Sequence, residues 1–280
     1  MDTESAWDEA SWHRWREARL RELRGPESWF GLVGLFWLEP GPNAVGSAAD
    51  CPVHLPTGPP RLGELVRSGE EVIWRAAPGA AVSTSGTAPE PAADGLRLHT
   101  DIGGAPTVLE TGSLHLFVIH REGHLAARVK DLGWAQRRPF AGIETYAFDP
   151  AWVVDAAWEA LAAPATIEIH TMTGAVKHVP VRHRAVFEHG GTTHSLWPLE
   201  DDDKGAFFVF RDATSASETY GGGRFLRAAP ARDARIVLDF NRAFNPPCAF
   251  TPYAACPLPP PENRLAIAVR AGEQRYRAAE

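Results

Sequence analysis

The stretch LHLFVIHREGHLAARV, residues 114–129, contains two apolar runs of strand length separated by a polar turn that includes Gly123. The first run covers residues 114–119 and the second covers residues 125–129. Apolar runs of this length on either side of a short glycine-containing turn are typical of a β-hairpin. The stretch therefore predicts two antiparallel strands near the middle of the chain.

The same pattern recurs on both sides of this hairpin. Residues 165–170 and 176–181 flank a turn at 171–174 and predict a second hairpin. Further strands are expected at residues 72–74, 96–99, 207–210, 223–226, 236–240 and 265–269. Many short strands with turn signals between them indicate a mainly β protein, with a barrel- or sandwich-like antiparallel sheet. Residues 76–95 are rich in Ala, Pro and Gly and predict a loop.

The N-terminal region differs, because its periodicity is helical. Residues 5–24 predict an amphipathic helix, with Ser5 as the N-cap and Gly25-Pro26 as the stop signal. Its apolar arc consists of Trp12, Trp15, Leu20 and Leu23. We therefore expect one β-rich domain over residues 1–280 with an N-terminal helix at about 5–24, and a candidate subdivision near residue 110.

Composition limits the classes of partner. The chain of 280 residues is 44% hydrophobic and 22% charged, with a net charge of −7. That balance is typical of a globular protein and argues against a nucleic-acid groove, which needs a dense basic surface. No apolar run is long enough to cross a bilayer, and the N-terminus lacks the pattern of a signal peptide. We expect a cytoplasmic protein with no membrane partner; its oligomeric state stays open.

The most distinctive residues lie towards the C-terminus. Residues 238–260 read LDFNRAFNPPCAFTPYAACPLPP, and ENRL follows at 262–265. Further motifs are FRDAT at 210–214, TYGGGRFL at 219–226, AGE at 271–273 and GLVGLFWL at 31–38. Together they resemble the domain-of-unknown-function family 1684 of bacterial and archaeal proteins, from about Trp12 to Glu273. The resemblance implies no established activity.

Polar residues crowd into the strand end at 238–240 and the turn after it. On a strand, Asp239 and Asn241 would point to one face and could line a cavity. Arg224 and Arg242 could together hold a carboxylate or phosphate. The candidate ligand-binding residues are Tyr220, Arg224, Asn241, Arg242, Asn245 and Asn263. The alternative is that these side chains satisfy backbone groups of a proline-rich loop that cannot pair as a strand.

Three residues are candidates for catalysis: Asp239 as a base or orienting group, and Cys248 and Tyr253 as secondary candidates. A catalytic cysteine needs a neighbour that favours the thiolate, and no His lies beside Cys248 in sequence. Structural thiols, and a disulfide between Cys248 and Cys256, are the alternatives. Asp212 is a further carboxylate that could meet Asp239 and form an acid–base pair.

No His, Cys or carboxylate motif predicts a metal site, and no glycine-rich motif predicts a nucleotide or other cofactor. Three functions follow from the sequence. The first is an enzyme, nominally a hydrolase, acting on a small polar or anionic organic molecule in a β-barrel pocket. The second is a non-catalytic barrel that binds such a ligand. The third is a structural or interaction protein without a pocket.

Overall fold

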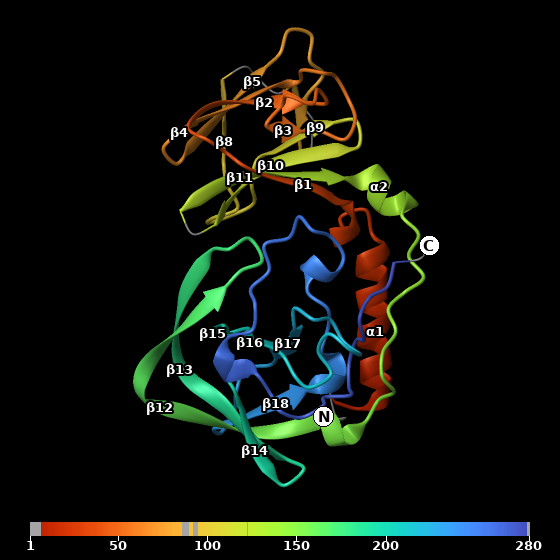
Figure 1. Ribbon diagram of the computed structural model, residues 1–280, viewed down its shortest axis with the longest axis vertical. Coiled ribbons are helices and arrows are strands. Elements are labelled where there is room, and N and C mark those ends of the chain that lie inside the picture. Colours follow the sequence, from red (N-terminus) through yellow and green to blue (C-terminus); the bar gives the residue numbers. More distant parts are fainter. Residues whose placement is uncertain (1–6, 86–89, 92–94, 122, 279–280) are drawn as a thin grey trace. The chain divides into compact units, whose positions relative to one another are not determined.

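The computed structural model describes residues 7–85, 90–91, 95–121 and 123–278, and its chain forms two compact units. One unit is Leu23–Arg138; the other combines Met1–Glu22 with Pro139–Glu280 (Figure 1). The candidate subdivision near residue 110 falls inside strand β9 (Val108–Thr111) of the first unit.

Helix α1 (Glu9–Arg24) is the expected N-terminal helix. The expected cap, Ser5, lies outside the described residues. Asp8 performs the capping instead, since its carboxylate accepts a hydrogen bond from the backbone N–H of Ser11 at 2.7 Å. The predicted apolar arc is confirmed, because Trp12 and Leu23 are buried and Trp15 and Leu20 are half-buried. No described helix is both long enough and apolar enough to span a lipid bilayer.

The unit Leu23–Arg138 contains two sheets, which enclose a core that includes Leu65, Trp74 and Val118. The six-stranded sheet has the order β1 (Leu32–Trp37), β11 (His124–Asp131), β10 (Leu114–Arg121), β9, β6 (Ser83–Thr84), β7 (Glu90–Pro91). The five-stranded sheet has the order β3 (Val53–His54), β2 (Gly41–Gly46), β4 (Gly63–Ser68), β5 (Glu71–Ala76), β8 (Leu96–Leu98). Two short helices accompany them, η1 (Trp29–Gly31) and α2 (Leu132–Arg137).

The hairpin predicted from residues 114–129 is confirmed as β10 and β11, which pair antiparallel from Leu114↔Asp131 to Arg121↔His124. The segment expected as a loop at 76–95 is not wholly irregular, because β6 and β7 pair within it. Both strands are only two residues long. Their shortness explains why no alternation marks them in the sequence.

The second unit is built on one long hairpin, β12 (Val153–His170) with β13 (Val176–His189). In Figure 1 these strands curve into a half-barrel. Their sheet has the order β14 (Thr192–Leu196), β13, β12, β18 (Arg235–Asp239). A three-stranded sheet has the order β15 (Glu200–Asp202), β16 (Gly205–Phe210), β17 (Arg224–Ala228). Short helix η2 (Pro150–Trp152) precedes β12.

Buried aromatic residues join these two sheets. Phe208 and Phe210 of β16 pack in one core cluster with Trp152 and Phe240. The ring centroids of Phe210 and Phe240 lie 5.5 Å apart in an edge-on arrangement, which aromatic pairs favour. This core supports the start of the C-terminal segment, which begins at Phe240.

Two strand predictions in this unit are wrong. The strand expected at 236–240 ends at Asp239, because residues Phe240–Arg242 form the 3₁₀ turn η3. The strand expected at 265–269 does not form; this stretch is irregular apart from backbone bonds to Arg211 and Ala213. After β18 the described chain contains only η3, η4 (Pro247–Ala249) and η5 (Pro261–Asn263) as regular elements.

Candidate functional site

The C-terminal segment, residues 240–278, contains most of the predicted site residues and has almost no sheet pairing of its own. Part of it lies against the tip of the β12–β13 hairpin. There the Leu258 N–H donates to the carbonyl of His170 at 2.7 Å, and the Met172 N–H donates to the carbonyl of Cys256 at 2.9 Å. Its proline-rich sequence removes backbone donors, so ladder pairing is not available along much of its length. Buried side chains supply the missing hydrogen bonds.

Asp239 and Asn241 contact one another, although not through strand alternation. Because residues 240–242 form a 3₁₀ turn, the Asp239 carboxylate accepts from the Asn241 backbone N–H at 3.1 Å and from its side-chain amide at 3.0 Å. Asn241 also exchanges two hydrogen bonds with the backbone of Asp149, both at 3.0 Å. The Asp239 side chain therefore caps the turn, and the Asn241 side chain holds the turn to the segment before β12.

Arg242 forms an ion pair with Asp239, with Nε 3.0 Å from Oδ2, and donates to the Ser11 hydroxyl at 2.7 Å. Asp239 is 2% exposed. Burial raises the pKa of its carboxyl, while the hydrogen bonds from Asn241 and the charge of Arg242 act in the opposite direction. The pair joins η3 to the start of α1.

Arg224 is fully buried and its guanidinium binds groups of the protein itself. Nη2 donates to the Asp212 carboxylate at 2.7 Å and to the carbonyl of Val269 at 2.8 Å, while Nη1 donates to the carbonyl of Ala271. The other Asp212 oxygen accepts from the Thr214 backbone N–H at 2.7 Å. Arg224 thus fixes residues 269–271 against β17, and Asp212 pairs with this arginine while Asp239 pairs with Arg242.

Asn245 lies beside a buried ion pair that the sequence analysis did not predict. Its backbone N–H donates to the Glu273 carboxylate at 2.6 Å, and its side-chain amide donates to the carbonyl of Gln274 at 2.7 Å. Arg19 of α1 lies 3.3 Å from the other Glu273 oxygen and donates to the carbonyl of Asn245 at 3.1 Å. Burial raises the pKa of Glu273, opposed first by the charge of Arg19.

Asn263 uses its whole amide group on the backbone. Its oxygen accepts from Trp197 N–H at 2.7 Å, and its nitrogen donates to the carbonyls of Trp197 and Val209 at 2.8 and 2.9 Å. The side chain is fully buried. Asn263 therefore fixes the turn η5 to the edge of β14 and to β16.

Tyr220, Cys248 and Cys256 form a third cluster. The Tyr220 hydroxyl donates to the carbonyl of Cys248 at 3.1 Å, and the backbone N–H of Cys248 donates to the Cys256 sulfur at 3.2 Å. Burial raises the pKa of the Tyr220 hydroxyl, so it stays protonated and remains a donor. Tyr253, by contrast, is 37% exposed at the surface.

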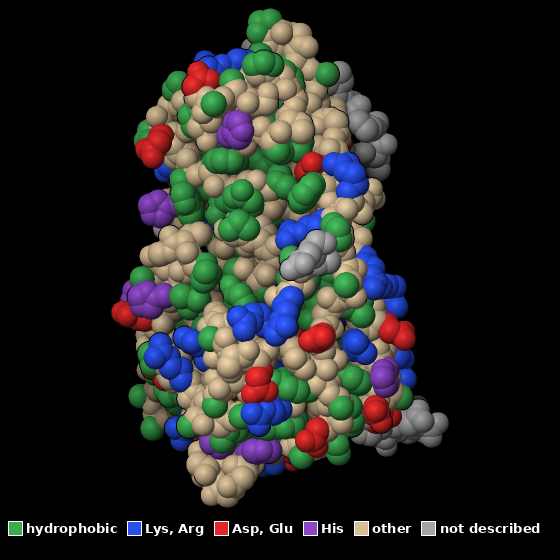
Figure 2. All heavy atoms as spheres, turned by 45° about the vertical axis from the view of Figure 1, so that its right-hand side comes forward, with side chains coloured by type: hydrophobic (Ala, Val, Ile, Leu, Met, Phe, Trp, Pro, Cys, Tyr) green, Lys and Arg blue, Asp and Glu red, His purple; other side chains and the backbone are tan. Residues whose placement is uncertain are grey.

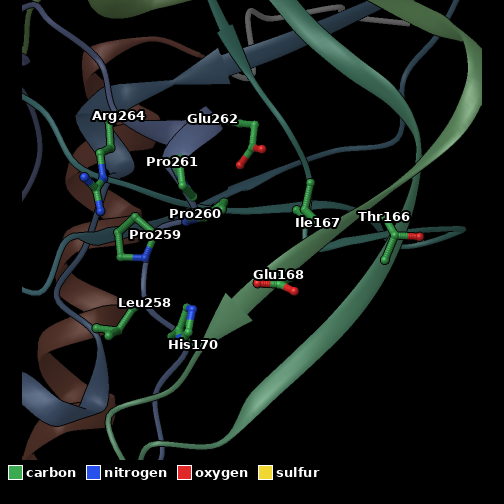
Figure 3. A pocket seen from close by; sticks show the side chains of 10 residues that line it. All are labelled: Thr166, Ile167, Glu168, His170, Leu258, Pro259, Pro260, Pro261, Glu262 and Arg264. Carbon is green, nitrogen blue, oxygen red and sulfur yellow. The ribbon is translucent and has the colours of Figure 1, made fainter.

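A cavity of about 660 Å³ lies between the end of β12 and the proline-rich part of the C-terminal segment (Figure 3). Its apolar lining includes Ile167, which is 3% exposed, and the buried Pro259 and Pro260. Strand alternation turns Ile167 inward and leaves its neighbours Thr166 and Glu168 exposed. The volume is within the range of cavities that bind small organic molecules.

The rim of this cavity is polar and charged. Four titratable side chains, all of them exposed, contribute to the lining: Glu168, His170, Glu262 and Arg264. Figure 3 shows Glu168 and His170 on the β12 side and Glu262 and Arg264 on the side of the C-terminal segment. Glu168 also lies 3.4 Å from the Nε2 of His178 on β13. The arrangement offers an arginine and two carboxylates to a molecule resting on an apolar floor.

Two residues, the predicted Asn263 and the glycine at 223, position this cavity without lining it. Asn263 lies between the lining residues Glu262 and Arg264 and fixes their turn. Gly223 has φ +92°, and a Cβ at this position would lie 2.4 Å from the Cγ of Pro259. The glycine at this position therefore permits a close approach of the backbone to the cavity wall.

Arg19 and the four rim residues were not predicted from the sequence. Arg19 lies seven positions after Trp12, so both belong to one face of α1, and this spacing was the available signal. Glu168 and His170 alternate with buried isoleucines, which identifies them as exposed but not as neighbours of residues 259–264. Among the described residues, no group of three His, Cys, Asp or Glu side chains could hold a metal ion.

Comparisons with known proteins find one family model and a solved structure. A search of curated proteins finds no match. An uncharacterized protein of Haloarcula marismortui, solved by solution NMR, is 31% identical and aligns over 48% of this chain and 77% of its own, with a TM-score of 0.40. Residues 138–274 match the model of the family described as protein of unknown function (DUF1684), a shorter range than the resemblance from Trp12 to Glu273. On this match, the chain belongs to that family of proteins of unknown function.

Proposed function

We propose that the unit ending at Glu280 binds a small polar or anionic organic molecule in the cavity between β12 and residues 258–264. One observation carries the proposal: a cavity of about 660 Å³ combines a buried apolar floor with a charged rim. Small-molecule sites typically pair apolar walls with a few polar groups that orient the ligand. The apolar body of a ligand would rest on Ile167 and the prolines.

Arg264 is the group best placed to bind an anionic part of the ligand. Its side chain lines the cavity and is exposed, whereas the guanidinium of Arg224 is occupied by Asp212 and backbone carbonyls. Arginine binds carboxylates and phosphates through two parallel hydrogen bonds. In this proposal Asn263 and Gly223 act as positioning residues, and ligand contacts from Tyr220, Asn241, Arg242 and Asn245 stay predictions.

The test is a thermal-shift screen of the full chain with small carboxylates and phosphate monoesters, each beside its neutral amide or alcohol counterpart. We expect anionic compounds to raise the melting temperature and Arg264→Ala to weaken their binding about tenfold to hundredfold, as loss of a charged hydrogen bond does. Arg182→Ala, an exposed arginine on β13 outside the cavity lining, is the matched control. Binding that Arg264→Ala leaves unchanged would refute the proposed site.

Hydrolysis of such a ligand is a second candidate, favoured by the presence of two carboxylates, Glu168 and Glu262, in the same lining. Two carboxyl groups flanking a bound molecule can act as acid and base. A catalytic role for Asp239 would first require its carboxylate to release Asn241 and Arg242. The test is turnover of any bound compound: Glu168→Gln and Glu262→Gln should each abolish hydrolysis and preserve binding.

The remaining parts of the proposal concern partners and location. The net charge of −7 favours a small-molecule partner over a nucleic acid. On the face drawn in Figure 2, Lys and Arg side chains are interspersed with Asp and Glu. A reducing cytoplasm is the proposed setting, since it suits free thiols at Cys51, Cys248 and Cys256.

A further inference from the structure

Cys248 and Cys256 are brought together by the fold of the residues between them. Pro246 and Pro247 accept turn hydrogen bonds from Ala249 N–H at 2.9 Å and Phe250 N–H at 3.0 Å, which reverse the chain. The Cys256 sulfur then lies 3.2 Å from the backbone nitrogen of Cys248. A disulfide requires α-carbons about 4.4–6.8 Å apart, and a sulfur this close to the partner's backbone is compatible with that requirement.

The two cysteines differ in exposure, and the surroundings of Cys248 favour its thiolate. Cys256 is 4% exposed, whereas Cys248 is half-buried and is therefore the more exposed residue of the two. A hydrogen bond from the Cys256 thiol lowers the pKa of Cys248; burial opposes the shift, and the Tyr220 hydroxyl adds to it. The thiolate is the nucleophilic form of cysteine, so Cys248 is suited to attack and Cys256 to resolve.

We propose that Cys248 and Cys256 are a peroxide-reactive dithiol, in which Cys248 is oxidised first and Cys256 then closes a reversible disulfide. This inference does not depend on the ligand proposed for the cavity. It concerns a modification site made of two neighbouring thiols, a half-buried Cys248 and a buried Cys256.

The chemistry proceeds in two balanced steps with a hydroperoxide as the oxidant. The Cys248 thiolate attacks the terminal peroxide oxygen, the O–O bond breaks, and the leaving alkoxide takes up the proton that Cys248 lost, giving a sulfenic acid and an alcohol. The Cys256 sulfur then attacks the Cys248 sulfur, the S–O bond breaks, and hydroxide leaves with the Cys256 proton as water. Two thiols lose two electrons in total, the peroxide gains them, and a dithiol reductant reverses the change.

Cys51 provides an internal control, because it belongs to the unit Leu23–Arg138. It is 5% exposed, and its sulfur accepts a hydrogen bond from Arg61 at 2.9 Å. The proposal predicts that Cys51 remains a thiol when the other two cysteines are oxidised.

The experiment treats the reduced full chain with one equivalent of hydrogen peroxide and maps disulfides by mass spectrometry of proteolytic fragments. We expect two of the three thiols to be lost, one intrachain bond between the fragments of Cys248 and Cys256, and full recovery of thiols with dithiothreitol. Because this measurement uses the unmodified protein, it does not depend on the folding of any variant. Oxidation of Cys51 before the pair, or peroxide that leaves both Cys248 and Cys256 as thiols, would overturn the proposal.

Variants then assign the roles of the two cysteines. Cys256→Ser should stop at a Cys248 sulfenic acid that a dimedone probe traps, while Cys248→Ser should lose both the trapped product and the disulfide. Cys51→Ser should behave as the unmodified protein does. If Cys256→Ser gave no trapped product and Cys248→Ser gave one at Cys256, the order of attack would be refuted.

Discussion

The β12–β13 hairpin and the C-terminal segment at 240–278 are both ordered, but through different kinds of hydrogen bond. The hairpin pairs backbone with backbone over ten register positions, from Ala157↔Val186 to His170↔Val176. The segment has only isolated bridges. The buried side chains of Arg224 and Asn245 donate to its backbone carbonyls, and its own Asn263 side chain bonds the backbone of Trp197 and Val209. In the second region, hydrogen bonds from buried polar side chains therefore take the place of the backbone hydrogen bonds between paired strands.

This difference changes how a polar, proline-rich motif is interpreted. A cluster of Asp, Asn and Arg side chains in a sequence can be interpreted as a binding site. Buried polar groups, however, need hydrogen-bond partners whether or not they bind a ligand. Here Arg224 and Asn245 donate to backbone carbonyls of a segment that has no strand partners. The neighbouring cavity at residues 258–264 depends on this bracing for its shape. Substitutions that remove single braces test the difference directly.

The largest effect is expected at Arg224. Arg224→Met leaves the buried Asp212 carboxylate and the carbonyls of residues 269 and 271 without their donor, and should lower the free energy of unfolding by about 3–5 kcal/mol. Arg227→Met on the same strand is the control, since its ion pair with Glu200 is 65% exposed on the arginine side and should cost about 0–1 kcal/mol. Urea denaturation measures both. Equal losses for the two variants would argue against bracing by Arg224.

Asn263→Ala is expected to have the next largest effect. It leaves the N–H and carbonyl of Trp197 and the carbonyl of Val209 without the hydrogen bonds that Asn263 makes to them. The free energy of unfolding should fall by about 2–3 kcal/mol. Asn263→Asp keeps the acceptor for the Trp197 N–H and loses the two donated bonds. It therefore separates the contribution of the accepted bond to stability from that of the donated bonds. If Asn263→Ala left denaturation unchanged but abolished ligand binding, a direct ligand contact would replace the bracing role.

A smaller loss is expected at Gly223. Gly223→Ala forces a side chain onto a residue at φ +92° and against Pro259, and should cost about 1–2 kcal/mol. Gly221→Ala is the control, because its added Cβ would meet nothing closer than 3.4 Å. Thermal denaturation followed by circular dichroism compares the two variants. A Gly221→Ala variant less stable than Gly223→Ala would contradict the expected packing.

The pH dependence of stability should differ in sign between two glutamates. Burial raises the pKa of Glu273, so the folded protein keeps its proton to a higher pH than the unfolded chain does. Stability contributed by this group is therefore lost as the pH rises above about 4.3, the ordinary value of the unfolded group. The unfolding free energy of the wild type minus that of Glu273→Gln should fall from pH 4 to pH 7; a rise would contradict the prediction.

Glu218 should show the opposite trend and the smallest effect. Hydrogen bonds from Arg270 and then from Tyr146 lower its pKa to about 2, below that of the unfolded chain. Its contribution is present above about 4.3 and is lost as the pH falls towards 2. The difference between wild type and Glu218→Gln should therefore shrink between pH 6 and pH 3, and a constant difference would show that the ion pair contributes nothing.

Much of the fold follows from the sequence, because alternation and turns are local signals. The hairpins at 114–129 and 165–181 and the amphipathic helix are confirmed for this reason. The end of β18 was placed one residue too late, since the Asp239 side chain caps a 3₁₀ turn that alternation does not reveal. The 265–269 stretch looks like a strand because it is apolar and its Leu265 and Val269 are buried, although it joins no sheet.

The site was harder to predict, because its partners are distant in sequence. Arg224 binds carbonyls 45 and 47 residues later in the chain, and Arg19 meets Glu273 254 residues later. A sequence shows that an arginine is present, but it does not show whether the guanidinium will donate to a backbone carbonyl or to a ligand. The cavity residues Glu168 and Arg264 likewise come from elements whose proximity only the fold establishes.

Amide hydrogen exchange tests the bracing of the C-terminal segment most directly. The informative amides are those of Asn245, bound to the Glu273 carboxylate at 2.6 Å, and Trp197, bound to the Asn263 oxygen at 2.7 Å. Bracing by buried side chains predicts that both are protected as strongly as the amides paired between β12 and β13. Exchange of these two amides as fast as that of the exposed turn at residues 233–234 would contradict it.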